Sequence, residues 1–429
     1  MARIFFLWML CWHGQVFAQT ATVQPWGLHQ LLSGAMASHP AVASQQAMVA
    51  AAQQGVSNAR WQYFPTPSIS VQGAKAGSAD AAYAGDSRVA VLALTQPLWT
   101  GGRIEAGVDK AHAYAQGARA SLAESQQQLA IRVVQAYGDW LSAHRKRAAY
   151  QVGLDQHIRL KDQVARRIHE GQAAESDLAL AQSRIASLEA DMAMTHTQEQ
   201  VSLGRLSQLL GKPVLSTALA LSPAQAWPIS LGADELLSKA QAFSPALARA
   251  RSNALAQLAT IAEAKSATLP ELSLRLEHQQ GNFNYSGGPQ HSRAFIQINS
   301  RLGAGLSSLG SVQEAVQRHA AALADIDSQQ RSLAEQVMTD HATLITTQSR
   351  RLALQTSAEL SDRVLASWDR QYLSGRKTWQ DLMNSAREQV QVQAQLADLE
   401  GLQLVASWRL ALTTGELHTG ELQAPAEQK

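Results

Sequence analysis

The longest run of regularly spaced apolar residues lies between Val108 and His169, a stretch that contains no proline. Successive apolar side chains are three, four or seven residues apart, which places them on one face of a helix. These positions are Leu122, Leu129, Val133, Ala136 and Trp140. We predict one helix over residues 103–169, about 100 Å long at 1.5 Å per residue. No compact core has that length, so the pattern indicates a rod.

A second apolar repeat follows Gly171 and continues to Leu210. Its heptad-like positions include Leu178, Ala181, Ile185, Leu188 and Met192. This spacing predicts a return helix over residues 177–210, packed against the first helix as an antiparallel coiled coil. The turn over residues 170–176 then forms the tip of the rod.

Apolar and polar residues alternate in two other regions, within residues 67–96 and more cleanly within residues 271–300. We predict a β-hairpin in each, with strands of about ten residues, long enough for a tilted strand to cross a bilayer. Four strands cannot close a membrane barrel, so this interpretation requires several copies of the chain. Soluble hairpins packed on the helices remain the alternative, because any half-buried sheet alternates in the same way.

The pattern repeats with an offset of about 204 residues, which is the signature of a duplicated unit. The matched pairs include Gly171 with Gly375, Asp177 with Asp381, and Gly211 with Gly415. We therefore expect a mainly α fold with a small β part, built from two tandem repeats. The expected repeats cover residues 19–211 and 234–416, with a Pro-rich linker outside the rod at 212–233 and a flexible tail at 417–429. In the second repeat we expect the hairpin at 271–300, the long helix at 311–373, the tip turn at 374–379 and the return helix at 380–414.

Short helices precede each hairpin. Ser38 and Pro40 have the residue types of a helix cap and first turn, for a helix that runs to about Arg60. A short helix and a return helix together have about the length of the long helix, so we expect them to stack end to end along it.

The composition mainly excludes classes of function. The chain is 46% apolar but only 6% aromatic, with a formal net charge of +2. Small side chains favour closely packed helices, and a net charge so near zero does not indicate nucleic-acid binding.

No catalytic motif is present, so we expect neither an enzyme nor a cofactor. His144, His157 and His169 are spaced about twelve residues apart, too far for one metal ion, and we interpret them as solvated positions, with no metal site.

The first residues have the pattern of an export signal. Arg3 precedes an apolar stretch, and Val16 and Ala18 supply the small residues of a cleavage site, which predicts a signal peptide over 1–18 and a mature start at Gln19. The single cysteine, Cys11, follows the bulky Leu10, which argues against a lipid-modified start. A mature chain without thiols suits an oxidising compartment.

Four aromatic residues flank the first hairpin on its helical side: Trp61, Tyr63, Phe64 and Trp99. Membrane barrels carry an aromatic girdle at this level, so we predict that these side chains lie at the membrane surface. Packing at the junction of helix and sheet is the alternative.

The segment from Gln96 to Gly102, the duplicated element order and the tip segments 170–184 and 372–388 together resemble the TolC-type outer-membrane channel proteins. The resemblance covers essentially the whole mature chain. It implies a homotrimer in the Gram-negative cell outer membrane, with a twelve-stranded barrel in the lipid and a helical tunnel extending into the periplasm. Its implied partners are a periplasmic adaptor and an inner-membrane ABC or proton-driven transporter, for which the trimer is the exit duct.

By the same resemblance, a gate closes the periplasmic end of the tunnel. Its linking residues fall on Ser176, Asp177, Tyr372 and Lys377, its inner acidic ring on Asp381 and Asn384, and its docking turns on Gly171 and Gly375. Lys377, beside Arg376, stands where the family's pattern has arginine, and lysine cannot form arginine's bidentate contact. Two alternatives need no gate: Asp177 suits the start of a helix, and Lys377 with Asp381 has the spacing of an exposed i,i+4 pair.

The segment 372–384 resembles the family members paired with type I protein exporters, which implies a protein cargo. An outer-membrane component of a multidrug or small-molecule efflux pump is the runner-up. A soluble periplasmic coiled-coil scaffold is a remote alternative, and it would need no alternating strands.

Overall fold

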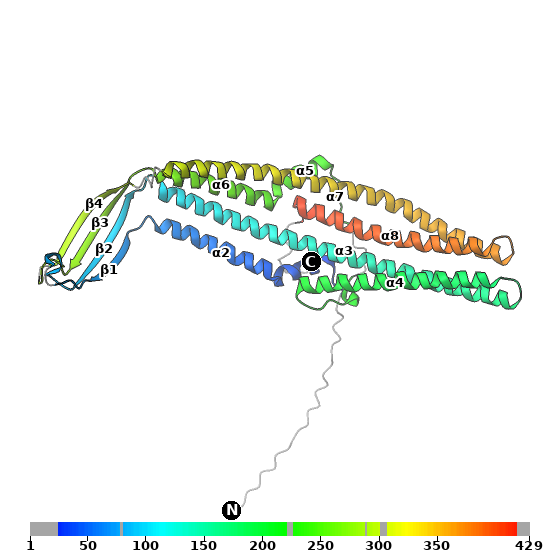
Figure 1. The fold of residues 1–429 in the computed structure, drawn as a ribbon. Coiled ribbons are helices and arrows are strands. Elements are labelled where there is room, and N and C mark those ends of the chain that lie inside the picture. The colour runs from blue at the N-terminus through cyan, green and yellow to red at the C-terminus, as the bar shows by residue number, and fades with distance from the viewer. Residues whose placement is uncertain (1–24, 78–79, 221–225, 288–289, 301–306, 418–429) are drawn as a thin grey trace, which may run out of the picture.

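The computed structural model describes residues 25–77, 80–220, 226–287, 290–300 and 307–417. Within these ranges the chain forms a long helical bundle with a four-stranded sheet at one end (Figure 1). The expected signal peptide and all but the first residue of the expected tail lie outside the described residues.

The helices confirm the tandem duplication. Corresponding helices of the two repeats have the same lengths, 11, 22, 67 and 36 residues. They are α1 (Leu28–Ser38), α2 (Pro40–Trp61), α3 (Arg103–His169) and α4 (Glu175–Leu210), then α5 (Ala233–Phe243), α6 (Pro245–Ser266), α7 (Ser307–Leu373) and α8 (Trp379–Thr414). The structure begins α4, α7 and α8 one to four residues before the predicted starts at 177, 311 and 380.

The predicted cap at Ser38 is wrong. Ser38 is the last residue of α1, and its hydroxyl donates to the carbonyl oxygens of Gly34 and Leu210. The cap of α2 is His39, whose Nδ1 accepts a hydrogen bond from the Ala41 amide at 3.2 Å. An imidazole nitrogen performs the role that a hydroxyl or carboxylate oxygen usually has.

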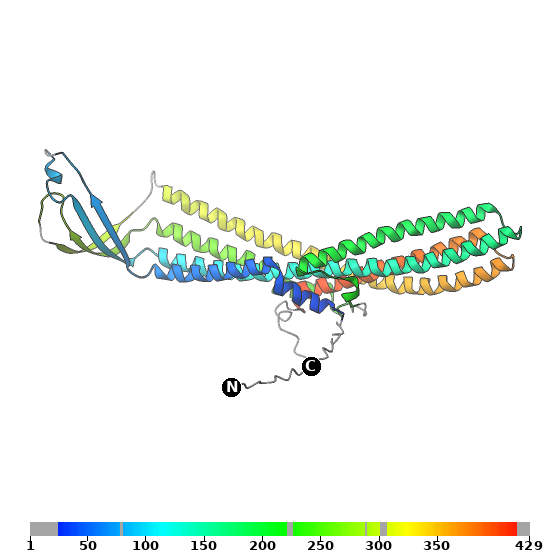
Figure 2. The ribbon, with the colours of Figure 1, turned by 90° about the horizontal axis from the view of Figure 1, so that it is seen from below.

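Helix α3 is the centre of the bundle and packs against α2, α4, α6 and α8. As the lengths predict, α2 and α4 follow one another along α3, and α6 and α8 follow one another between α3 and α7 (Figures 1 and 2). Two glycines face each other where α3 crosses α8. A Cβ atom at Gly401 would lie 2.8 Å from the Gly138 carbonyl oxygen, so only glycine permits this approach.

The four strands form one antiparallel sheet in the order β1-β2-β3-β4. Their bounds are Thr66–Gly73, Arg88–Trp99, Glu271–Gln280 and His291–Asn299. Strand β2 passes the predicted end at residue 96 through a register shift between Pro97 and Trp99. The sheet extends beyond the bundle (Figure 1), so the alternative of hairpins packed on the helices is wrong.

One face of the sheet is apolar and exposed. The register places Leu92, Leu94, Leu274, Leu276, Ile296 and Ile298 on that face together with Ile69 and Val71. Ile69 and Ile296 are 76% and 74% exposed. Arg275 and Glu277 lie on the opposite face, where they form an ion pair.

Candidate functional site

The candidate site lies at the end of the rod farthest from the sheet, where α3 turns into α4 and α7 into α8 (Figure 1). Gly171 and Gly375 close these turns with φ values of 71° and 72°, a left-handed conformation that favours glycine. Each turn has the paired backbone bonds of a Schellman motif, with the Gln172 amide donating to the Arg167 carbonyl at 2.8 Å and the Arg376 amide to the Gln371 carbonyl at 2.9 Å.

Two aromatic side chains form the buried centre of this site. Tyr372 and Trp379 are 7% and 4% exposed, and their ring centroids are 5.2 Å apart. They pack in a cluster with residues from both hairpins: Leu160, Val164, Ala181, Leu365, Leu382 and Met383. The tips of the two hairpins therefore share one small core.

Two further contacts connect the hairpins. The Trp379 indole Nε1 donates to the main-chain oxygen of Asp177 at 2.8 Å. The Arg167 guanidinium lies 4.7 Å from the Tyr372 ring centroid, and its Nη1 donates to the Tyr372 main-chain oxygen at 3.2 Å. Sequence reasoning missed Trp379 and Arg167, although a tryptophan beside a helix cap is a visible signal in a chain with so few aromatic residues.

The predicted gate residues come together only in part. Among the described residues, the Tyr372 hydroxyl makes no hydrogen bond to the Asp177 carboxylate. Burial raises the pKa of Tyr372. The charge of Arg167 opposes that rise, and the smaller effect of Asp177 adds to it. Ser176 and Asp177 lie in the first turn of α4, where a carboxylate interacts well with the helix dipole.

Lys377, Thr378 and Asp381 form the start of α8. Thr378 and Asp381 make a capping box, and hydrogen bonds with the side chain and backbone of Thr378 lower the pKa of Asp381. The Lys377 Nζ is 4.0 Å from Asp381 Oδ2 and 4.2 Å from the ring centroid of Trp368. Within one chain, Lys377 and Asp381 thus form the simple i,i+4 pair. Asn384 is exposed one turn further along α8.

At the other end of the rod, Trp61, Tyr63, Phe64 and Trp99 are all exposed, by 43% to 65%. Trp61 is the last residue of α2 and Trp99 the last of β2, so both lie where the helices meet the sheet. Packing within the chain leaves all four rings largely uncovered, and the aromatic girdle stays a prediction.

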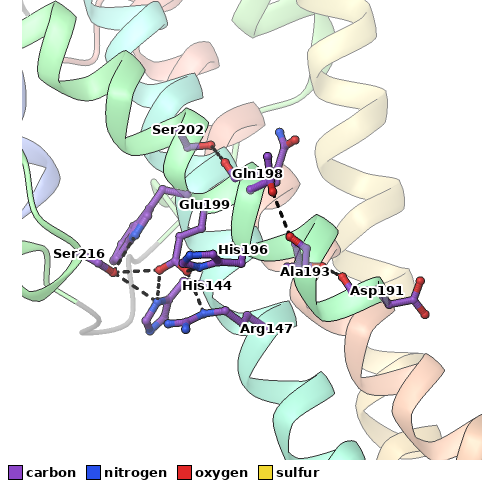
Figure 3. Close-up of polar contacts among 12 residues, drawn as sticks. His144, Arg147, Asp191, Ala193, His196, Gln198, Glu199, Ser202 and Ser216 are labelled. Carbon is purple, nitrogen blue, oxygen red and sulfur yellow. Dashed lines mark hydrogen bonds and ion pairs between the residues drawn. The ribbon is translucent and has the colours of Figure 1, made fainter. Parts of the chain in front are cut away.

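A second polar site, in the middle of the rod, was also missed. The Glu199 carboxylate on α4, whose side chain is 2% exposed, lies 2.8 Å from His144 Nδ1, 2.8 Å from Arg147 Nε and 3.0 Å from the Ser216 hydroxyl (Figure 3). Ser216 belongs to the linker between the repeats, and it also accepts a hydrogen bond from the Trp140 indole. This Glu199 cluster therefore fixes the linker to α3 and α4.

The interpretation of the histidines as solvated is wrong for two of them. His144 contacts Glu199, and His157 is 1% exposed, with burial lowering its pKa. Burial alone would raise the pKa of Glu199, but hydrogen bonds from His144 and Ser216 and the charge of Arg147 outweigh it and lower that pKa. In the described part of the chain, no three side chains are placed to bind a metal ion, and no helix is both long and apolar enough to span a membrane.

Solved structures with the same fold cover nearly the whole chain. The outer membrane protein VceC of Vibrio cholerae matches at 16% identity and TM-score 0.78, over 90% of this chain and 96% of its own. The outer membrane channel CmeC of Campylobacter jejuni matches at 13% and 0.76, over 94% and 87%. The open-state outer membrane channel MtrE of Neisseria gonorrhoeae matches at 17% and 0.75, over 90% and 88%. No curated protein sequence matches the chain.

The chain therefore has the fold of these outer-membrane channel proteins. The sequence profile of the outer membrane efflux protein family matches residues 31–212 and 236–416, one match for each repeat. The chain belongs to the outer membrane efflux protein family.

Proposed function

We propose that three copies of this chain form a channel in the outer membrane that extends into the periplasm. The observation that carries this proposal is the uncovered apolar face of the sheet, with Ile69, Val71, Ile296 and Ile298 each at least 67% exposed. Burying such a face in lipid is favourable, and joining β1 of one copy to β4 of the next removes the open sheet edges. Three sheets then give a twelve-stranded barrel.

The channel would act as the exit duct of a tripartite export system, with a periplasmic adaptor at the tip turns of Gly171 and Gly375 and an inner-membrane transporter as the energy source. We assign the gate to Ser176, Asp177, Tyr372, Lys377, Asp381 and Asn384. Tyr372 acts inside each protomer, because it is buried between the hairpins. Lys377, Asp381 and Asn384 are accessible enough to form links between neighbouring protomers.

The gate assignment predicts that Tyr372→Phe combined with Lys377→Ser raises the conductance of the closed channel. Lys377→Ser removes a charge-assisted contact worth about 1.5 to 3 kcal/mol, and threefold symmetry multiplies the loss. Tyr372→Phe removes a hydroxyl that interacts with Arg167. Single-channel recording in planar bilayers measures this, with Arg318→Ser, an exposed residue of α7 paired to Glu314, as the control. An unchanged closed state in the double variant contradicts the gate assignment.

For the cargo, we propose a protein delivered by a type I exporter, supported by the resemblance of segment 372–384. Small-molecule efflux is the second candidate, and the family's description as efflux proteins favours it. A deletion strain separates the two candidates. Loss of one large secreted protein without increased drug sensitivity supports protein secretion, and increased drug sensitivity with normal secretion supports efflux.

A further inference from the structure

We propose that Trp379 is the positioning residue that holds the two hairpin tips of a protomer together, through a neutral hydrogen bond to the main chain at Asp177. This inference rests on the proposed gated channel and assigns a role that the gate residues named above do not cover. It assigns a link within each protomer to an indole, beside the contact of Arg167 with Tyr372, and leaves Lys377, Asp381 and Asn384 available to link protomers to one another.

The geometry around Trp379 supports this role. Its indole Nε1 is 2.8 Å from the Asp177 oxygen, and the side chain is 4% exposed. The Thr378 cap and its capping box fix the start of α8, and Trp379 is the first residue of that helix. Tyr372 packs against the indole at 5.2 Å between centroids, so the ring has little freedom to turn. Because packing holds the indole in place, its N–H stays aligned with the acceptor oxygen.

The acceptor is a main-chain oxygen, so no substitution at position 177 removes it. An indole donates but carries no charge, and a carbonyl cannot titrate in the ordinary range. The link should therefore be insensitive to pH and salt, whereas links between charged side chains weaken as salt shortens the screening length to about 3 Å at 1 M.

The test measures the distance between the two tip turns within one protomer. Spin labels at Gln172→Cys and Ser374→Cys are on exposed positions of the two turns. The only native cysteine, Cys11, lies in the expected signal peptide, so the mature chain should carry no other thiol. Mixing labelled with excess unlabelled protomers confines the signal to one protomer. Trp379→Phe keeps the ring and removes the donor, and Trp140→Phe removes an indole donor that is equally buried but lies in the middle of the rod.

We expect Trp379→Phe to broaden the tip-to-tip distance distribution and to raise the closed-state conductance by roughly two- to tenfold, the equilibrium change that one neutral hydrogen bond supports. Trp140→Phe should leave the distance unchanged, and the wild-type distance should be the same in dilute buffer and in about 1 M salt. An unchanged distance in Trp379→Phe, or separation of the tips in high salt, overturns the inference.

The salt series uses the wild-type protein, so separation of the tips in high salt would overturn the inference even if Trp379→Phe fails to fold. Failure of the proposed function is a different result: the wild-type protein would then form no conducting channel in planar bilayers, whatever the distance between the tips. A conducting wild type with an unaffected Trp379→Phe variant contradicts only the role of Trp379.

Discussion

Glu199 and Trp379 are single side chains whose partners belong to other segments, and each determines the packing at one level of the rod. Sequence spacing could predict the cap at Thr378 and Asp381, because both residues lie within one turn. It could not predict Glu199, because its partners are 55 residues away at His144 and 17 residues away at Ser216. Only the pairing of α3 with α4 and the path of the linker bring these groups together.

At the residue scale, we expect Glu199→Gln to destabilise the protein by about 2 kcal/mol at neutral pH, because it leaves Arg147 and His144 without their carboxylate. Since the folded-state pKa of Glu199 is lowered, its contribution is full above the unfolded value of 4.5 and is lost as pH falls through the folded value. Denaturant unfolding across pH should show the two proteins converging in acid.

The control for that experiment is Asp327→Asn, which removes an exposed i,i+4 partner of Arg331 and should change stability by less than about 0.5 kcal/mol. A difference between wild type and Glu199→Gln that is constant from neutral to acid pH contradicts the linkage.

At the element scale, periodicity alone located the long helices, because 67 residues of apolar spacing leave little room for another interpretation. It could not show which helices touch. Contact between α3 and α8 depends on Gly138 and Gly401. These glycines are far apart in the sequence, and no sequence pattern indicates that they face each other. The helix cap at His39 was missed for a related reason, since histidine is an uncommon cap.

We expect Gly401→Ala to destabilise the bundle by about 1 to 3 kcal/mol, because its Cβ would lie 2.9 Å from the Ser142 Cβ as well as close to Gly138. The matched control is Gly107→Ala in α3, where nothing lies within 4 Å of the new atom. There the higher helix propensity of alanine should stabilise the protein by up to about 1 kcal/mol. Equal effects of both substitutions on thermal unfolding would mean that α3 and α8 do not approach this closely.

At the scale of the whole molecule, the alternating strands predicted the sheet and its two faces, and the family match agrees with the duplicated plan. The number of copies could not be derived from the residues, because it depends on how β1 and β4 meet strands of other copies. The exposed face of the sheet is nevertheless a property of one chain, and its burial in lipid can be tested one position at a time.

We expect Ile296→Arg to prevent accumulation of assembled protein in the outer membrane, because arginine on a lipid-facing position costs about 2 to 4 kcal/mol at the bilayer centre. Gln297→Arg is the matched control, since the neighbouring residue points to the opposite face of the same strand. Membrane fractionation with unheated gel samples should detect the assembled form of the control but not of Ile296→Arg. The same yield for both variants would contradict the assignment of the apolar face to lipid.

We propose that several copies of the chain complete one membrane channel, and the mass of the native particle tests this most directly. Native mass spectrometry of protein extracted from outer membranes should give three copies of the mature chain, from a preparation that also conducts in planar bilayers. A water-soluble monomer recovered from the periplasmic fraction would contradict the account.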